Sequence, residues 1–269
     1  MKKTKIFMTA LALGISSFAF AQVNLNFGLG YHQGAFGNEM GYTAETDASG
    51  VTTETATNLS FGGGIPITIG VGLGITDNIT LDANFEYWLG SEKTVLDQSS
   101  PLGSGTAVTK SNQIRFAPSL LFHNGDNGLY GRVGLVLPVG GKTTVEIVQE
   151  GGGFKSTENQ ESAGAFSVGG VAGVGYKHGI SDNLQIFGEL QAVALTIKSK
   201  SSTITDYEDN LGGTLDSQYP TVQDKETEYV DEVKSTDNSD TSKPWMETAS
   251  KSAYSSLGLN VGIRWIFGG

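Results

Sequence analysis

The chain has 269 residues and contains no cysteine, only six prolines and only three histidines. Without cysteine, neither a disulfide framework nor a cysteine metal site can hold the fold together. The histidines, His32, His123 and His178, are far apart and form no metal-ligand motif. We therefore expect no metal and no cofactor, and stability has to come from the packing of the chain itself.

Long apolar runs are also absent after residue 21, and none approaches the ~20 residues that a transmembrane helix needs. The N-terminus differs, because three of the first five residues are lysine, residues 6–20 are mostly apolar, and an Ala-Phe-Ala motif follows. This pattern predicts a secretory signal peptide cleaved between Ala21 and Gln22. The alternative, a membrane-anchoring helix, has too few apolar residues to span a bilayer. The predicted organisation is a signal peptide over 1–21 and one domain over 22–269.

Basic residues are few. Seventeen Lys and Arg against 28 Asp and Glu give a net charge of −11, and loss of the three signal-peptide lysines brings the mature chain to −14. An acidic surface repels phosphate backbones, so we expect no nucleic-acid partner. Glycine is abundant, with 38 residues and no collagen-like period. Together with the alternation described next, this indicates a glycine-rich sheet rather than a disordered chain.

Apolar residues occupy every second position in eight long runs, the pattern of strands with one apolar face. The runs lie at residues 23–32, 61–75, 79–89, 113–123, 129–139, 166–177, 184–197 and 256–267. In the seventh run the apolar positions change parity at Val193, which predicts a β-bulge near Gln191 to Ala194.

Three connections between these runs are short and rich in Asp, Asn and Gly, residues that favour tight β-hairpins. They are Thr76-Asp77-Asn78, Asn124-Gly125-Asp126-Asn127 and Ser181-Asp182-Asn183. The other four are long and polar, at about 37–57, 91–110, 148–162 and 200–251. Short turns at one end and long loops at the other predict an all-β fold: an eight-stranded antiparallel up-and-down transmembrane β-barrel with short periplasmic turns and long extracellular loops. Strands of roughly 12 to 16 residues would extend beyond the ~9–11 that cross a bilayer.

Alternation does not say which face points outward, so a soluble barrel or sandwich with a dry core is the alternative. The apolar face carries no charged residue in any run, and its aromatic residues gather toward both ends. Such girdles are typical of membrane barrels. The aromatic residues are Phe122, Tyr176, Trp265 and Phe267 near the tight turns, and Phe61, Tyr87 and Phe166 near the loops.

The opposite face would then line the lumen. It carries a predicted charge network of Asp82, Glu86, Arg115, Arg132, Lys177, Glu189 and Arg264. Counted from the nearest turn, Glu86 and Arg115 lie at one height, and Asp82, Arg132 and Glu189 at another, so opposite charges are expected to pair. Side chains can fill an eight-stranded barrel, which favours a plugged lumen. The many inward glycines leave open a water-filled groove, and with it a narrow pore or small-ligand cavity.

Catalysis is a third possibility, since some small barrels combine a histidine with a serine or carboxylate near the outer rim. His123 and His178 lie beside tight turns, and His32 has no His-x-Ser neighbour. We expect no enzymatic activity and no catalytic residue.

Residues 201–250 hold twelve acidic residues against three lysines, with few apolar residues. This composition predicts a solvated, disordered loop. Two alternatives remain open: the carboxylates could bind divalent cations, or aromatic residues could anchor a surface ligand. The aromatic residues are Tyr207, Tyr219, Tyr229 and Trp245.

The Ala-Phe-Ala motif, the two Asp-Asn turns and the final Gly-Leu-Asn-Val-Gly-Ile-Arg-Trp-Ile-Phe together resemble small Gram-negative outer-membrane β-barrels of the OmpA transmembrane domain, OmpX and OmpW type. The resemblance covers residues 22–269. It implies an outer-membrane location, contact with outer-membrane lipids including lipopolysaccharide, and assembly through periplasmic chaperones and the barrel-assembly machinery. Members usually end on an aromatic assembly signal, here Phe267 with Trp265, although Gly268 and Gly269 follow. The expected function is a non-enzymatic structural or surface-interaction role, with a small-solute channel as the alternative.

Overall fold

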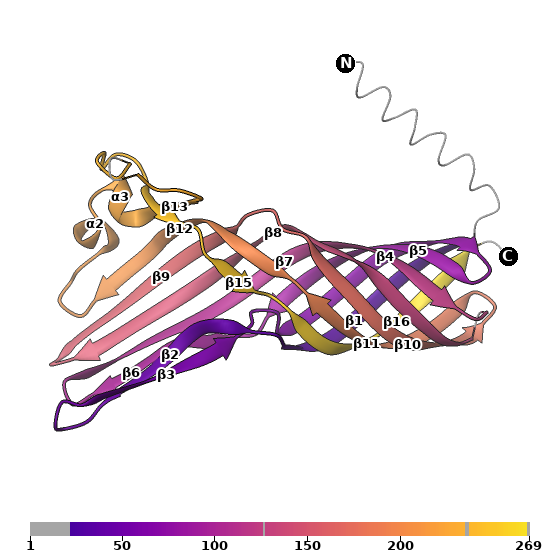
Figure 1. The fold of residues 1–269 in the computed structure, drawn as a ribbon, viewed down its shortest axis with the longest axis horizontal. Helices are drawn as coiled ribbons and strands as arrows, with labels where there is room; N and C mark the ends of the chain where they lie inside the picture. Colours follow the sequence, from indigo (N-terminus) through magenta and orange to yellow (C-terminus); the bar gives the residue numbers. More distant parts are fainter. Residues whose placement is uncertain (1–21, 126, 235–236, 268–269) are drawn as a thin grey trace, which may run out of the picture.

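The computed structural model describes residues 22–125, 127–234 and 237–267, most of which lie in β-strands. Eight strands form a closed antiparallel barrel, as predicted (Figure 1). They are β1 (Val23–Gly34), β4 (Gly64–Thr76), β5 (Ile79–Gly90), β7 (Gly103–His123), β8 (Gly128–Gly151), β10 (Gly169–Ser181), β11 (Leu184–Ala194) and β16 (Ser256–Phe267). The predicted signal peptide and the cleavage residue Ala21 lie outside the described residues, as do Asp126, Gly268 and Gly269.

Pairing of the first and last strands closes the barrel. Strand β1 pairs antiparallel with β16 from Val23 opposite Phe267 to Gly34 opposite Ser256, and β7 pairs with β8 on the far side. The described chain therefore begins and ends side by side at one end of the barrel. Tight turns at this end join β4 to β5 and β10 to β11, which confirms the predicted hairpins.

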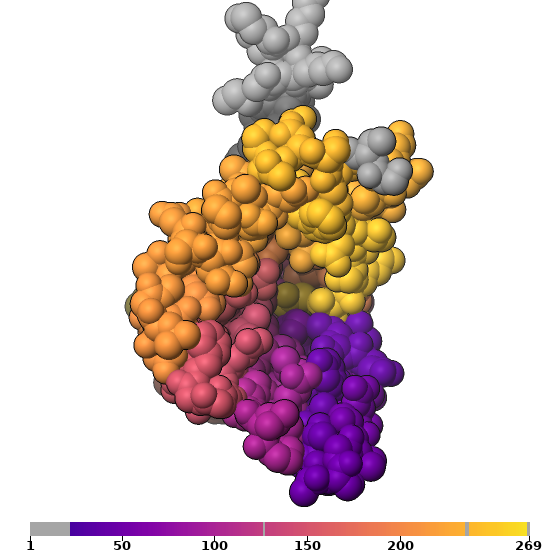
Figure 2. Space-filling view, turned by 90° about the vertical axis from the view of Figure 1, so that its left-hand side faces the viewer, coloured from indigo at the N-terminus to yellow at the C-terminus, as the bar shows by residue number. Residues whose placement is uncertain are grey.

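The four predicted long connections consist mainly of strands, which continue the barrel wall into a long curved extension (Figure 1). The additional strands are β2 (Asn38–Thr46), β3 (Thr52–Leu59), β6 (Lys93–Ser100), β9 (Phe154–Gly164), β12 (Thr196–Asp209), β13 (Glu226–Val230), β14 (Trp245–Thr248) and β15 (Lys251–Ala253). Viewed end-on, the extension is a curved wall around a hollow (Figure 2). Polar residues dominate these strands, so they lack the apolar alternation by which the barrel strands were recognised.

Two barrel strands run directly into the extension and exceed the predicted 12 to 16 residues. Strand β7 has 21 residues and β8 has 24, and they remain paired as far as Gly103 opposite Gly151. Their upper parts are rich in threonine and valine, residues that favour strands.

The acidic segment 201–250 is also more ordered than its composition predicts. Strand β12 continues to Asp209 against β9, and two short helices follow, α2 (Leu215–Gln218) and α3 (Val222–Lys225). Hydrogen bonds from the backbone supply the order that apolar burial does not. For example, the Asp209 carboxylate accepts bonds from the backbone N–H groups of Leu211 and Gly213.

The predicted bulge near Gln191 to Ala194 is not formed. Strand β11 keeps an uninterrupted register with β10 through Ala194, and the odd positions of the strand stay inward throughout. What changes at Val193 is the chemistry of the interior, which turns from polar to apolar. A register shift occurs instead on β8, where Arg115 faces Pro138 and Ile114 faces Gly140, so Val139 is an additional residue.

Candidate functional site in the barrel interior

All seven predicted lumen charges lie inside the barrel. Asp82 and Arg115 are completely buried, and the other five have little exposed surface. They come from six strands: β5 carries Asp82 and Glu86, β7 carries Arg115, β8 carries Arg132, β10 carries Lys177, β11 carries Glu189 and β16 carries Arg264. The alternation of each strand places them on its inner face.

The lower part of the lumen is a connected ion-pair network. The Asp82 carboxylate lies 3.2 Å from the Arg264 guanidinium and 3.5 Å from that of Arg132. Arg132 in turn contacts Glu189 at 2.9 Å, and the Tyr130 hydroxyl donates a 2.7 Å hydrogen bond to the same carboxylate. Four strands are thus tied together across the lumen by groups that satisfy one another's charge.

Amide side chains extend this network. Arg264 Nε donates to Asn26 Oδ1 at 2.7 Å. On the opposite side, the Gln191 amide donates to Glu189 at 3.3 Å and accepts from Asn260 Nδ2 at 3.1 Å. Four other amide side chains of the inner face, Asn24, Asn84, Gln113 and Gln185, are buried as well.

The middle of the lumen is organised differently from the prediction. Glu86 and Arg115 are direct neighbours across β5 and β7, but the ion pair expected between them is not among those of the described residues. Arg115 instead places its guanidinium 3.8 Å from the ring centre of Trp88 and donates from Nε to Gln113 at 2.8 Å. A cation over an indole face is stabilised by the ring quadrupole, an arrangement that the positions of charges in the sequence do not reveal.

His32 also faces this layer, with its ring edge-on to Trp88 at a centroid distance of 5.0 Å. Its two ring nitrogens lie 3.1 Å from Ser256 Oγ and 3.2 Å from Asn260 Oδ1. A serine in contact with a histidine, which in turn contacts an orienting side chain, is the arrangement of hydrolase triads. Here His32 is 1% exposed and Ser256 is fully buried, so a substrate cannot reach the hydroxyl in this conformation.

The inward glycines do not leave a groove along their strands. A Cβ atom built on Gly175 would lie 2.4 Å from the Tyr130 ring, and one on Gly258 would lie 2.3 Å from the His32 ring. Similarly, the Glu189 carboxylate covers Gly173. The glycines therefore accommodate large side chains from neighbouring strands. A cavity of about 20 Å³, lined by residues of β1, β4, β5, β8, β11 and β16, has room for about one water molecule.

An apolar layer, which the sequence analysis missed, closes the lumen above the polar groups. Val193, Leu195 and Ile197 point inward and are buried. They form a cluster with Phe61, Ala117, Val136, Val171 and Tyr254. Phe61 was expected in the outer aromatic girdle but packs inside at 5.6 Å from the Tyr254 ring. The sequence signal for this layer was the change of parity at Val193, because from this residue on the apolar side chains lie on the inward face of the strand.

The outer surface of the barrel is apolar, whereas its interior is charged and polar. Within the eight apolar runs, the outward positions carry mostly exposed apolar side chains and no Asp, Glu, Lys or Arg; the exposed charges of β7 and β8, such as Lys110 and Lys142, lie above these runs. At the turn end, the exposed rings of Trp265 and Phe267 stack with a centroid distance of 6.2 Å. Gln22, the predicted first mature residue, is exposed at this same end.

The acidic extension offers no evident metal site. Within the described ranges, no group of three or more His, Asp or Glu side chains is placed to hold a metal ion. Of its aromatic residues, Tyr207 and Tyr219 contact each other edge-to-face at 5.8 Å, and Tyr219 donates a hydrogen bond to Glu158. Burial and this bond raise the pKa of the Tyr219 hydroxyl. Trp245 is exposed. Binding of cations or of a surface ligand remains a prediction.

None of the helices in the described part of the chain is long and apolar enough to cross a membrane.

Known proteins show little similarity to this chain. No protein-family model matches the chain, and no curated protein matches it. Among solved structures, the chain is similar to CarO2 of Acinetobacter baumannii, with 10% sequence identity, over 91% of this chain and 98% of that chain, at a TM-score of 0.34. A likeness of this size carries no functional argument.

Proposed function

We propose that this protein is a non-enzymatic integral outer-membrane barrel with a closed lumen, whose extension forms a surface for interactions outside the cell. The observation that carries the proposal is the combination of an uncharged apolar exterior with a charged interior. The expected partners are outer-membrane lipids including lipopolysaccharide, and during assembly the periplasmic chaperones and the barrel-assembly machinery.

The exterior matches a bilayer in height as well as in chemistry. Along β16, outward residues from Leu257 to Phe267 are apolar over eleven positions, close to the ~9–11 residues with which a tilted strand crosses the hydrocarbon core. An exposed apolar surface of this extent around a whole barrel is unfavourable in water, which argues against the soluble barrel. The turns then face the periplasm and the extension faces outward.

The location is tested by adding proteinase K to intact cells and comparing gel mobility with and without boiling. Cleavage is expected within 231–234 or 237–244, where the described chain forms no strand, with a protected barrel that shifts on heating. Complete protection together with the absence of a heat shift would contradict both the topology and the barrel.

A closed lumen is supported by two successive barriers. The ion-pair network of Asp82, Arg132, Glu189 and Arg264 fills the lower part, and the apolar cluster fills the upper part. Purified protein in planar bilayers is expected to show no steady conductance. Regular conductance steps would replace this proposal with the channel described next.

A narrow channel is the second candidate, because several buried polar atoms of the lumen have no partner among the described residues. They are Asn24 Oδ1, Asn26 Nδ2, Asn84 Oδ1 and Glu86 Oε2. Buried groups of this kind are commonly hydrated, and a file of water molecules through them would favour passage of small solutes.

The absence of enzymatic activity is a proposal that the burial of Ser256 supports. A fluorophosphonate probe, which labels activated serine hydroxyls, is expected to leave the folded protein unlabelled. Labelling at Ser256 that is lost in His32→Gln would show that the buried serine is activated and reachable.

A further inference from the structure

The barrel wall is open at one place, between β8 and the segment that joins β9 to β10. Strand β8 pairs with β10 only as far as Val136 opposite Gly169, and with β9 only from Thr143 opposite Ser162. Between these points, residues 137–142 form no ladder with 163–168. The wall therefore parts at the upper edge of the apolar exterior.

The sequence of β8 favours this opening. Pro138 has no N–H to donate to a neighbouring strand, and Val139 is the extra residue of the bulge against β7. Gly141 has φ +127°, a conformation that side-chain-bearing residues rarely adopt. A donor-less residue, a bulge and a glycine in succession turn β8 away from β10.

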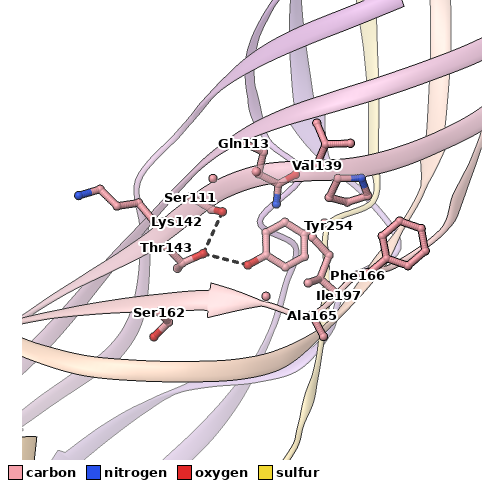
Figure 3. A pocket seen from close by; sticks show the side chains of 14 residues that line it. Ser111, Gln113, Val139, Lys142, Thr143, Ser162, Ala165, Phe166, Ile197 and Tyr254 are labelled. Atoms are coloured by element: carbon pink, nitrogen blue, oxygen red, sulfur yellow. Dashed lines mark hydrogen bonds between the residues drawn. The ribbon is translucent and has the colours of Figure 1, made fainter. Parts of the chain in front are cut away.

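A cavity of about 390 Å³ occupies the opening (Figure 3). Its volume is within the range of small-molecule sites. On the outer side lie Val139 and Phe166, which are 57% and 76% exposed and belong to the apolar exterior. Directly above them, Lys142 and Glu161 form an exposed ion pair. The mouth thus lies where lipid tails give way to headgroups if the barrel is in a membrane.

The inner end of the cavity is polar. Thr143 Oγ1 donates to Ser111 Oγ at 2.9 Å and lies 3.0 Å from the Tyr254 hydroxyl, so three hydroxyl groups meet there (Figure 3). The Gln113 amide nitrogen points toward the same space (Figure 3), because its oxygen accepts from Arg115 Nε. Hydroxyl and amide donors at one end of an apolar cavity suit an oxygen-bearing headgroup.

Charge behind this polar end favours an anion. Arg115 is fully buried, and both its terminal guanidinium nitrogens lack a hydrogen-bond partner among the described residues. Through Gln113 this cation polarises the donor that faces the cavity. The carboxylate nearest the mouth, Glu161, is already paired with Lys142.

The cavity also continues into the hollow of the extension. A second cavity of about 270 Å³ shares five of its lining residues. They are Thr143, Ser162, Gly164, Ile197 and Tyr254. A molecule could therefore contact the extension, the hydroxyl groups and the outer apolar surface without crossing the closed lumen.

We propose that this lateral cavity binds a long-chain carboxylate. The carboxylate accepts hydrogen bonds from the Gln113 amide and from the hydroxyl groups of Thr143 and Tyr254, whose protons turn toward it from their present hydroxyl partners. The chain leaves between Val139 and Phe166 along the barrel exterior. The direction of the tail rests on the proposed membrane location, whereas the cavity and its polar end do not.

The test uses the full mature chain folded in phosphatidylcholine nanodiscs and palmitic acid carrying a photoreactive diazirine. Cross-links are expected on peptides containing 137–142 and 164–168, and unlabelled palmitic acid is expected to compete with them. Methyl palmitate is expected to compete at least about tenfold more weakly, because it lacks the charge that favours strong hydrogen bonds.

Two pairs of variants locate the site. Thr143→Val is expected to weaken binding about 10- to 150-fold, the range of one hydrogen bond to a charged group, whereas Thr144→Val, outside the cavity, is expected to leave it unchanged. Ala165→Trp fills the cavity and is expected to abolish the cross-links, whereas Ala172→Trp, on the outer face of β10, is expected to preserve them.

Three outcomes would overturn the inference. Equal competition by acid and ester would leave an acyl groove without a carboxylate site. Cross-links spread evenly over all eight strands would show ordinary contact with lipid tails, and labelling unaffected by Ala165→Trp would place the probe elsewhere. Heat-shifted mobility of the same samples separates a failure of this site from a failure of the barrel.

Discussion

The Arg115 guanidinium lies 3.8 Å from the ring centre of Trp88, although its direct neighbour across the strands is Glu86. The cation in the middle of the lumen thus stacks on an indole face and forms no direct ion pair with the adjacent carboxylate. We expect the stacking to be energetically important because both groups are fully buried.

A double-mutant cycle with Arg115→Met and Trp88→Leu measures this contact. Desolvated cation-π pairs contribute about 2 kcal/mol or more, so unfolding in urea is expected to give a coupling energy of about 2 kcal/mol. The matched cycle of Arg115→Met with Tyr87→Leu, whose ring faces outward, is expected to show almost none. Equal coupling in the two cycles would refute a specific interaction.

Arg132 is the centre of the lower network, since it contacts both Asp82 and Glu189. Arg132→Met leaves two buried carboxylates with fewer partners, and removal of one member of a buried pair costs about 3–5 kcal/mol. The urea midpoint of the folded barrel is expected to fall accordingly. As a control, Lys198→Met removes the exposed pair with Asp231 and is expected to change stability by less than about 1 kcal/mol. Similar effects of the two variants would show that the ion-pair network does not stabilise the barrel.

The Tyr130 hydroxyl donates to the Glu189 carboxylate inside the barrel. Tyr130→Phe keeps the ring against Gly175 but removes the donor, which is expected to cost about 1.5–3 kcal/mol, the range for a hydrogen bond to a charged group. Tyr176→Phe is the matched control, because Tyr176 is exposed on the outer face. The same urea titration distinguishes them, and an unchanged midpoint for Tyr130→Phe would contradict the bond.

In the extension, Asp240 provides a test of electrostatics outside the barrel. The Ser242 hydroxyl, together with Lys243 and the Ser242 backbone N–H, lowers the pKa of Asp240 to about 2. Because this pKa is depressed on folding, the bonds stabilise the turn above pH ~4 and lose that effect as the pH falls toward about 2. Carboxyl NMR titration is expected to show a higher pKa for Asp240 in Ser242→Ala and no change in Thr241→Ala. A normal value in the unmodified protein would disprove the turn geometry.

The barrel strands could be predicted because each has one apolar and one polar face. In β16 the residues Leu257 to Phe267 alternate except at the inward Ile266, and the same pattern identifies the seven lumen charges by position. The extension could not be predicted in this way, because β3 is solvated on both faces and β12 beyond Lys198 is mostly polar on both faces, so neither has a reason to alternate. They form by backbone pairing, β3 with β2 and β12 with β9, and β9 in turn pairs with β8, which runs up from the barrel.

The candidate site was only partly accessible from sequence for a related reason. Height along a strand predicted that Asp82, Arg132 and Glu189 lie together, and the structure pairs them. The stacking of Arg115 on Trp88 depends instead on side-chain direction across β5 and β7. The lateral cavity depends on where β8 stops pairing with β10, which no local pattern records.

The sequence by itself determined the eight strands, their closure and the separation of an apolar from a charged face, because these follow from a period of two and from turn residues. The tertiary structure alone decided that Val193, Leu195 and Ile197 close the lumen, that the acidic segments form a wall, and that one seam of the barrel is open. The physical reason is that these features depend on contacts between residues distant in the chain, which local periodicity does not encode.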